Sequence, residues 1–98
     1  MTKKKSNGSR NPSRETLLEF PCRFPIKAMG RTDRGFQAIV THIVRTHAEL
    51  WPGEPVRANE SRNGNYVAVT LVVRATSQEQ LDAIYQDLTD SPDVLMAL

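Results

Sequence analysis

One stretch of the chain, Asn65–Ala75, constrains the fold more than any other. It reads NYVAVTLVVRA and is the longest run of strand-favouring residues in the sequence. Successive side chains of a strand point to opposite faces, so this stretch has two rows. One row is entirely apolar: Val67, Val69, Leu71, Val73 and Ala75. The other row is only half polar: Tyr66, Ala68, Thr70, Val72 and Arg74. We therefore expect a central strand with one fully buried face.

The residues before this stretch predict a strand followed by a helix. The strand covers Arg23–Met29, and Gly30 is expected to end it. In Arg34–Glu49 the apolar residues recur three and four apart, which indicates a helix with one buried side. Thr32 or Asp33 is the expected N-cap.

The remaining segments predict two more strands and a second helix. Val56–Ser61 is short and polar, which is typical of an edge strand. The dipeptide Asn63-Gly64 favours a hairpin that joins it to the central strand. Ser77 begins the second helix, with Gln80 in the capping-box position. The last strand is Val94–Leu98, and three of its residues are expected to face the core: Val94, Met96 and Leu98.

The order strand, helix, strand, strand, helix, strand predicts an α+β fold, the ferredoxin-like βαββαβ sandwich. Its four-stranded antiparallel sheet has the order 4-1-3-2, and both helices cover one face. Trp51, in the loop after the first helix, is expected to close the core.

Charge divides the chain into a tail and a body. Residues 1–14 hold five Lys/Arg and no acid, and we expect a disordered basic tail there. Residues 15–98, expected to form a single domain, hold eight Lys/Arg and eleven Asp/Glu, a net charge of −3. This acidic balance argues against general nucleic-acid binding, although the tail could contact phosphate non-specifically.

The chemistry-bearing residues indicate no enzyme, metal site or cofactor. His42 and His47 are five apart, so they do not share a helix face, and Cys22 has no histidine in a defined relation to it. No apolar run reaches the roughly 20 residues that span a bilayer. No apolar segment follows the amino-terminal lysines as in a secretory signal. With one cysteine, a cytoplasmic location is expected.

The sheet face without helices is the candidate interaction face. Alternation along the strands assigns six residues to it: Lys27, Met29, Thr70, Val72, Arg74 and Leu95. With Ala97, three of them would form an apolar patch, which often marks an interface. The alternative is a scatter of apolar residues without function. The apolar edge Val94–Leu98 could also pair with a second copy, unless an arm at residues 15–21 shields it.

Two loops offer weaker candidates. The turn Gly30–Asp33 could present backbone N–H groups to an anion, or it could be an ordinary strand-to-helix turn. The hairpin Arg62–Tyr66 could bind a partner through Tyr66, although turn geometry alone explains its Asn-Gly.

Two segments and the carboxyl end resemble the YbeD family of small bacterial proteins. They are LLEFPCRFPIKAMG (Leu17–Gly30), NGNYVAVTLVVRATSQEQLDAIYQDL (Asn63–Leu88) and VLMAL (Val94–Leu98). The positions that match the family's motifs are Phe20, Pro21, Phe24, Lys27, Gly30, Gly64, Asn65 and Tyr66. The chain departs from the family by its basic tail and by Leu95 where arginine can occur.

The resemblance implies a ferredoxin-like fold similar to ACT regulatory domains, no recognised catalytic residue, and a suggested link with lipoate metabolism. The expected function is a small regulatory or adaptor module without enzymatic activity. A protein partner or a homodimer is expected, with a small metabolite as a further candidate ligand, and neither membrane nor nucleic-acid binding is expected. One alternative is an RRM-like nucleic-acid binder, against which the open face has no aromatic residue except Tyr66. Another is an acylphosphatase-like enzyme, against which the phosphate-binding loop of that enzyme is incomplete here.

Overall fold

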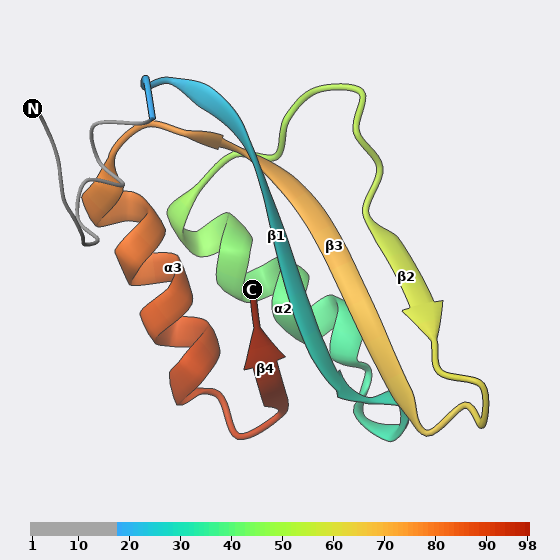
Figure 1. Ribbon diagram of the computed structural model, residues 1–98. Helices are drawn as coiled ribbons and strands as arrows, with labels where there is room; N and C mark the ends of the chain where they lie inside the picture. The colour runs from blue at the N-terminus through green and yellow to red at the C-terminus, as the bar shows by residue number, and fades with distance from the viewer. Residues whose placement is uncertain (1–17) are drawn as a thin grey trace, which may run out of the picture.

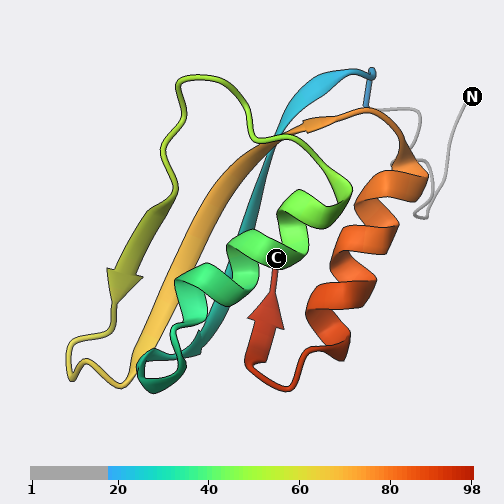
Figure 2. The same ribbon diagram turned by 180° about the vertical axis from the view of Figure 1, so that it is seen from behind.

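A four-stranded antiparallel sheet and two helices form two layers in the computed structural model, which describes residues 18–98 (Figure 1). The sheet order is β2-β3-β1-β4, and both helices cover the same face, as the view from behind shows (Figure 2). The predicted ferredoxin-like βαββαβ fold and strand order are therefore confirmed. The elements are β1 (Cys22–Arg31), the 3-10 turn η1 (Thr32–Arg34), α2 (Phe36–His47), β2 (Arg57–Glu60), β3 (Tyr66–Ala75), α3 (Gln78–Asp90) and β4 (Val94–Ala97).

The central pair β1 and β3 organises the core, as the sequence predicts. The two strands pair over their full lengths, from Cys22 opposite Ala75 to Arg31 opposite Tyr66. Their helix-facing side chains pack against one stripe of each helix. The largest fully buried side chains are Ile26, Val69, Leu71 and Val73 of the sheet, Phe36, Val40 and Val44 of α2, and Ile84 and Leu88 of α3.

The two helices begin differently. At α3 the Ser77 hydroxyl accepts the N–H of Gln80 at 3.0 Å, so the predicted N-cap is confirmed. At α2 the predicted caps Thr32 and Asp33 are wrong, because both lie in the short turn η1. Gly35 precedes α2 with φ of +64°, a left-handed conformation that suits glycine.

Gly30 does not end the first strand, contrary to the prediction. It is the ninth residue of β1 and is buried, with Val67 opposite it in β3. A Cβ atom at this position would overlap the ring of Phe36 and lie 2.6 Å from the carbonyl oxygen of Asp93. Gly30 is therefore required by the close approach of α2 and of the turn before β4. Of the candidate anion-binding turn Gly30–Asp33, the first two residues lie in β1 and the last two in η1.

The segment Ala48–Val56 continues the sheet where β2 stops short. The first helix was expected to run to Glu49, but α2 ends at His47 and Leu50 forms a bridge with Val73. Trp51 donates its backbone N–H to the Val72 carbonyl at 2.8 Å, and Arg74 donates its backbone N–H to the Glu49 backbone carbonyl at 2.9 Å. This extended segment therefore pairs with the carboxyl-terminal part of β3, on the side where β2 pairs with its other part.

The predictions for the amino-terminal end fall partly outside the described residues. The basic tail at 1–14 lies there entirely, as do residues 15–17 of the predicted arm. From Leu18 to Phe20 the chain has no helix, and both of these residues pack against the core.

Candidate functional site

Three of the four exposed large apolar side chains of the described residues lie in or just after β4. They are Leu95, Met96 and Leu98, which are 59%, 50% and 61% exposed, whereas the fourth, Tyr66, begins β3. β4 is an edge strand, with β1 on one side only. Among residues 18–98 no further strand lies on its outer side. Apolar side chains on an unprotected edge are typical of an interaction surface.

A register shift in β4 changes which of its side chains face the core. Ala97 pairs with Ala28 and Met96 with Met29, but Val94 pairs with Gly30, so Leu95 has no partner residue in β1. Val94 and Ala97 pack against the core. The prediction that Met96 and Leu98 face the core is therefore wrong, as is the placement of Ala97 on the open face. Met96, rather than Leu95, lies beside Met29 on the open face, because paired residues share a face.

The open face differs from the predicted patch at Val72. This residue is only 7% exposed, although alternation puts it on the side without helices. The hydrogen bond from the Trp51 N–H to the Val72 carbonyl holds the segment Ala48–Val56 beside Val72. Register then places the Trp51 indole on the same face of the sheet as the Val72 side chain. Trp51 is predicted to close the core, but it is not among the side chains that pack against it, and register with Val72 places it on the face without helices.

An ion pair holds this covering segment in place. The guanidinium of Arg23 contacts the Glu54 carboxylate, with Nε to Oε2 at 2.6 Å. Arg23 lies on the open-face row of β1, and Glu54 follows the Pro52-Gly53 turn. The end of the open face near Arg74 and Val72 is thus partly covered, whereas among residues 18–98 no such segment is bonded alongside the end near Met29.

The remaining predicted face residues lie in two adjacent rows across the sheet. In one row Lys27 is paired with Thr70, which is paired in turn with Arg57 of β2. In the next row Met29 lies between Met96 and Ala68. Lys27 and Arg57 are exposed, whereas Met29 and Thr70 are half-buried. Sequence reasoning missed Arg57, because register between strands does not follow from either strand alone.

The hairpin and the start of β1 hold the other motif residues. The Thr32 hydroxyl donates to the Gly64 carbonyl at 2.7 Å, and its N–H donates to Asn65 at 3.1 Å. The Arg31 guanidinium lies 5.7 Å from the ring centroid of Tyr66. Phe20 and Phe24 pack against the core, and the Phe20–Pro21 peptide bond is cis. Most motif positions are therefore structural, and Tyr66 is half-exposed beside a cation.

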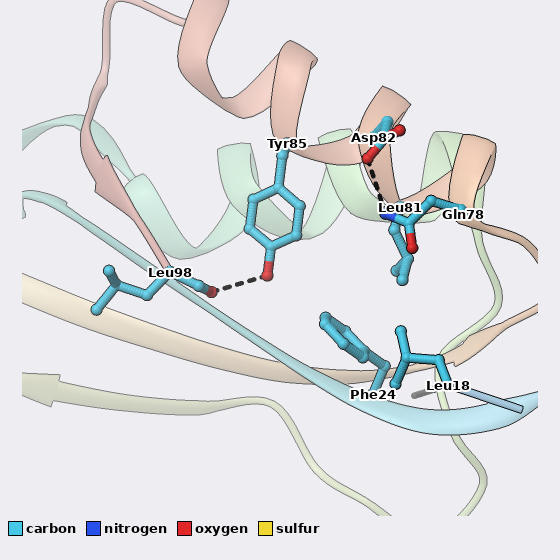
Figure 3. Close-up of a pocket in the computed structure, with 7 residues that line it drawn as sticks. All are labelled: Leu18, Phe24, Gln78, Leu81, Asp82, Tyr85 and Leu98. Carbon is cyan, nitrogen blue, oxygen red and sulfur yellow. Dashed lines mark hydrogen bonds between the residues drawn. The ribbon is translucent and has the colours of Figure 1, made fainter. Parts of the chain in front are cut away.

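A pocket of about 260 Å³ lies between the start of β1, helix α3 and the end of β4 (Figure 3). Tyr85 donates its hydroxyl to the carbonyl of Leu98 at 2.9 Å, and the Gln78 amide nitrogen donates to Asp82 at 2.9 Å. The walls are mainly apolar. Its lining residues are Leu18, Phe24, Gln78, Leu81, Asp82, Tyr85 and Leu98. Sequence reasoning named no pocket, because its lining comes from three separate segments.

The titratable groups of the described residues form no metal site. Within residues 18–98, no three His, Cys, Asp or Glu side chains gather closely enough to hold a metal ion. His47 pairs with Asp87 between the helices, which gives it a structural partner. In the described part of the chain, neither helix is long and apolar enough to cross a membrane.

Comparison with known proteins places the chain in a family. The family described as a protein of unknown function, DUF493, matches residues 15–98. This chain belongs to the DUF493 family. The UPF0250 protein NE1487 of Nitrosomonas europaea is 45% identical over 84 residues, covering 86% of this chain and 97% of the relative. A UPF0250 protein of Chromobacterium violaceum is also 45% identical, over 85 residues, covering 87% and 96%. The resemblance to the YbeD family is thereby confirmed.

A solved structure confirms the fold of the DUF493 chain independently of sequence. The solution structure of protein HP0495 from H. pylori aligns with a TM-score of 0.63 at 14% identity, covering 93% of this chain and 98% of that one. At this identity the likeness concerns the fold alone. The relatives carry no enzymatic name, so the family brings no catalytic residue to this chain.

Proposed function

We propose that this DUF493 protein is a regulatory or adaptor module that binds a protein partner through β4 and the adjacent open face. The observation that carries the proposal is the exposure of Leu95, Met96 and Leu98 on an edge strand. Backbone geometry adds to it. The backbones of Lys27 and Leu98 exchange two hydrogen bonds, of 3.1 and 2.7 Å. The residue before Leu98, Ala97, therefore points its backbone N–H and C=O away from β1. A partner strand could pair with these groups.

The test is affinity capture from the native cell with matched edge variants. The double variant Leu95→Lys/Met96→Lys places charges on the β4 edge, and Ala58→Lys places one on the opposite edge, β2, where the side chain is also exposed. We expect the β4 variant to lose the captured partner and the β2 variant to retain it. Retention by both variants, or loss only in Ala58→Lys, would contradict the proposal.

A homodimer is the simplest alternative within this proposal, and size-exclusion chromatography with light scattering distinguishes it. A mass that doubles with concentration in the wild type and in Ala58→Lys, but not in the β4 variant, would identify a second copy as the partner. A monomer at all concentrations that also captures nothing from the cell would rule out both forms of the proposal.

The apolar pocket supports a second candidate function, the response of the same edge to a small metabolite. Leu98 lines the pocket and also hydrogen-bonds to Lys27 of β1, so a ligand there would contact the end of the edge. NMR titration with a metabolite collection is the test. We expect shifts at Tyr85 and Leu98 for a binder, lost when Leu18→Trp fills the pocket. No shift at these residues with any compound would contradict this function.

The other inferences from resemblance remain predictions. The link with lipoate metabolism and the likeness to ACT domains rest on the family alone.

For the RRM-like alternative, the positions of β1 and β3 that face away from the helices, apart from the terminal Tyr66, carry no aromatic side chain on which a base could stack. The acylphosphatase-like alternative loses its loop, because Gly30 and Arg31 lie inside β1.

A further inference from the structure

The charges of this protein are partly segregated between its two layers, although the net charge of the body is negative. By register, the open face carries a line of cations along β1, four residues apart, with others from β2 and β3 beside it. They are Arg23, Lys27, Arg31, Arg57 and Arg74. The charge balance of the sequence alone conceals this basic face, because it averages over both layers.

Half of the ten acids in residues 18–98 lie in or just after α3, while Glu49 and Glu54 lie beside the open face. After Arg74 the chain contains no further Lys or Arg, but it contains five acids in and just after α3: Glu79, Asp82, Asp87, Asp90 and Asp93. Helix α3 covers the other face of the sheet from the cations (Figure 1). The two charge groups are therefore separated by the apolar core, and the α3 acids do not neutralise the open face.

Acids lie beside some of the open-face cations and not others: the Leu50–Val73 bridge places Glu49 opposite Arg74, whereas register places only Thr70 between Lys27 and Arg57. Arg23 is neutralised by Glu54, and Arg31 lies against the Tyr66 ring. Lys27, Arg57 and Arg74 form no ion pair with any residue of the described chain, 18–98. Exposed cations without a partner are available to bind an external anionic group.

Two of these cations border the apolar residues that carry the proposed function. Lys27 and Arg57 lie on either side of Thr70, and strands about 4.8 Å apart put their Cα atoms roughly 10 Å from each other. The next row along the sheet holds Met29 and Met96. A ligand that lies across the two rows would meet positive charge and flexible thioether side chains together.

We propose that the open face binds an acidic segment of a partner protein, with carboxylates on Lys27 and Arg57 and an apolar side chain on Met29 and Met96. The proposal deepens the proposed function and rests on it. Charge argues against a second copy at this face, because two open faces would oppose cation to cation. The apolar row and the absence of aromatic residues in the middle of the face favour a protein over a nucleic acid.

Site-specific photo-crosslinking in the native cell tests the proposal. Benzoylphenylalanine replaces Thr70, at the centre of the face, in the full-length chain. Thr41 of α2 is the matched control, because it is also a half-buried threonine but lies in the helix layer. The cross-linked segment is then identified by mass spectrometry. We expect position 70, and not position 41, to capture a segment with more Asp and Glu than Lys and Arg.

Charge reversal provides the second arm of the test. Lys27→Glu/Arg57→Glu is expected to lower the yield of the cross-link at position 70 by about tenfold or more, and rising salt is expected to lower it in the wild type. Arg45→Glu, an exposed cation of α2, should leave the yield unchanged. Circular dichroism checks that each variant keeps the fold.

Several results would overturn the proposal. They are a cross-link to nucleic acid, to a basic segment or to α3 of a second copy, equal capture from position 41, and no cross-link at position 70. The β4 variants separate this failure from that of the proposed function. If Leu95→Lys/Met96→Lys abolishes capture while position 70 cross-links nothing, the edge strand acts without the basic face. If the β4 variants still capture the partner and position 70 cross-links an acidic segment, the face acts without the edge.

Discussion

Gly30 shows at the scale of one residue how a motif position serves packing. We predict that Gly30→Ala destabilises the fold by about 1–3 kcal/mol, because the added methyl group overlaps Phe36 and the Asp93 carbonyl. Urea unfolding followed by circular dichroism measures it. Gly53→Ala tests a different cause of instability, because Gly53 has φ of +81° and no atom within 4 Å of an added Cβ, so its loss reports backbone strain alone. A loss below about 0.5 kcal/mol for Gly30→Ala would contradict the account of Gly30.

Thr32 fastens the hairpin to the end of β1 through one hydroxyl. We predict that Thr32→Val costs about 1 kcal/mol of unfolding free energy, because it removes the bond to the Gly64 carbonyl and leaves the shape nearly unchanged. Thr46→Val removes a hydroxyl bond within α2, to the carbonyl of His42, at an exposed position. Its expected cost is within about 0.5 kcal/mol. The assignment fails if the two variants lose the same stability.

At the scale of the element, the sequence predicts what depends on local pattern. Alternation identified β3 and its buried row, and periodicity identified both helices, because those signals reside within each segment. The start of α3 was also predicted, from Ser77. We expect Ser77→Ala to lower the unfolding free energy by about 1 kcal/mol, and Thr89→Ala, exposed on the same helix, to change it less. Urea titration of both variants checks this, and equal effects would contradict the cap.

What the sequence did not predict depends on contacts between elements. The exposure of Met96 follows from a register shift between β4 and β1, and the burial of Val72 follows from the chain segment that runs beside it. Neither contact leaves a periodic signal in its own strand. The pocket beside α3 and the pairing of Lys27, Thr70 and Arg57 were missed for the same reason.

At the scale of the whole molecule, charge segregation should be measurable without a partner. Deleting residues 1–14 leaves eight Lys/Arg and eleven Asp/Glu. We predict that this net-negative protein is still retained on a cation-exchange resin at low salt, because its basic face can meet the resin. Lys27→Glu should then reduce retention more than Arg45→Glu, although both change the net charge equally. Equal elution of the two variants would show that net charge alone governs retention.

The proposed function requires that β4 is the edge on which a partner docks. Amide hydrogen exchange of the captured complex, read residue by residue against the free protein, tests it most directly. We predict that the partner slows exchange at Leu95 and Ala97 and leaves Ala58 and Asn59 of β2 unchanged. Slower exchange at β2 or on the helices, with β4 exchanging as in the free protein, would contradict the claim.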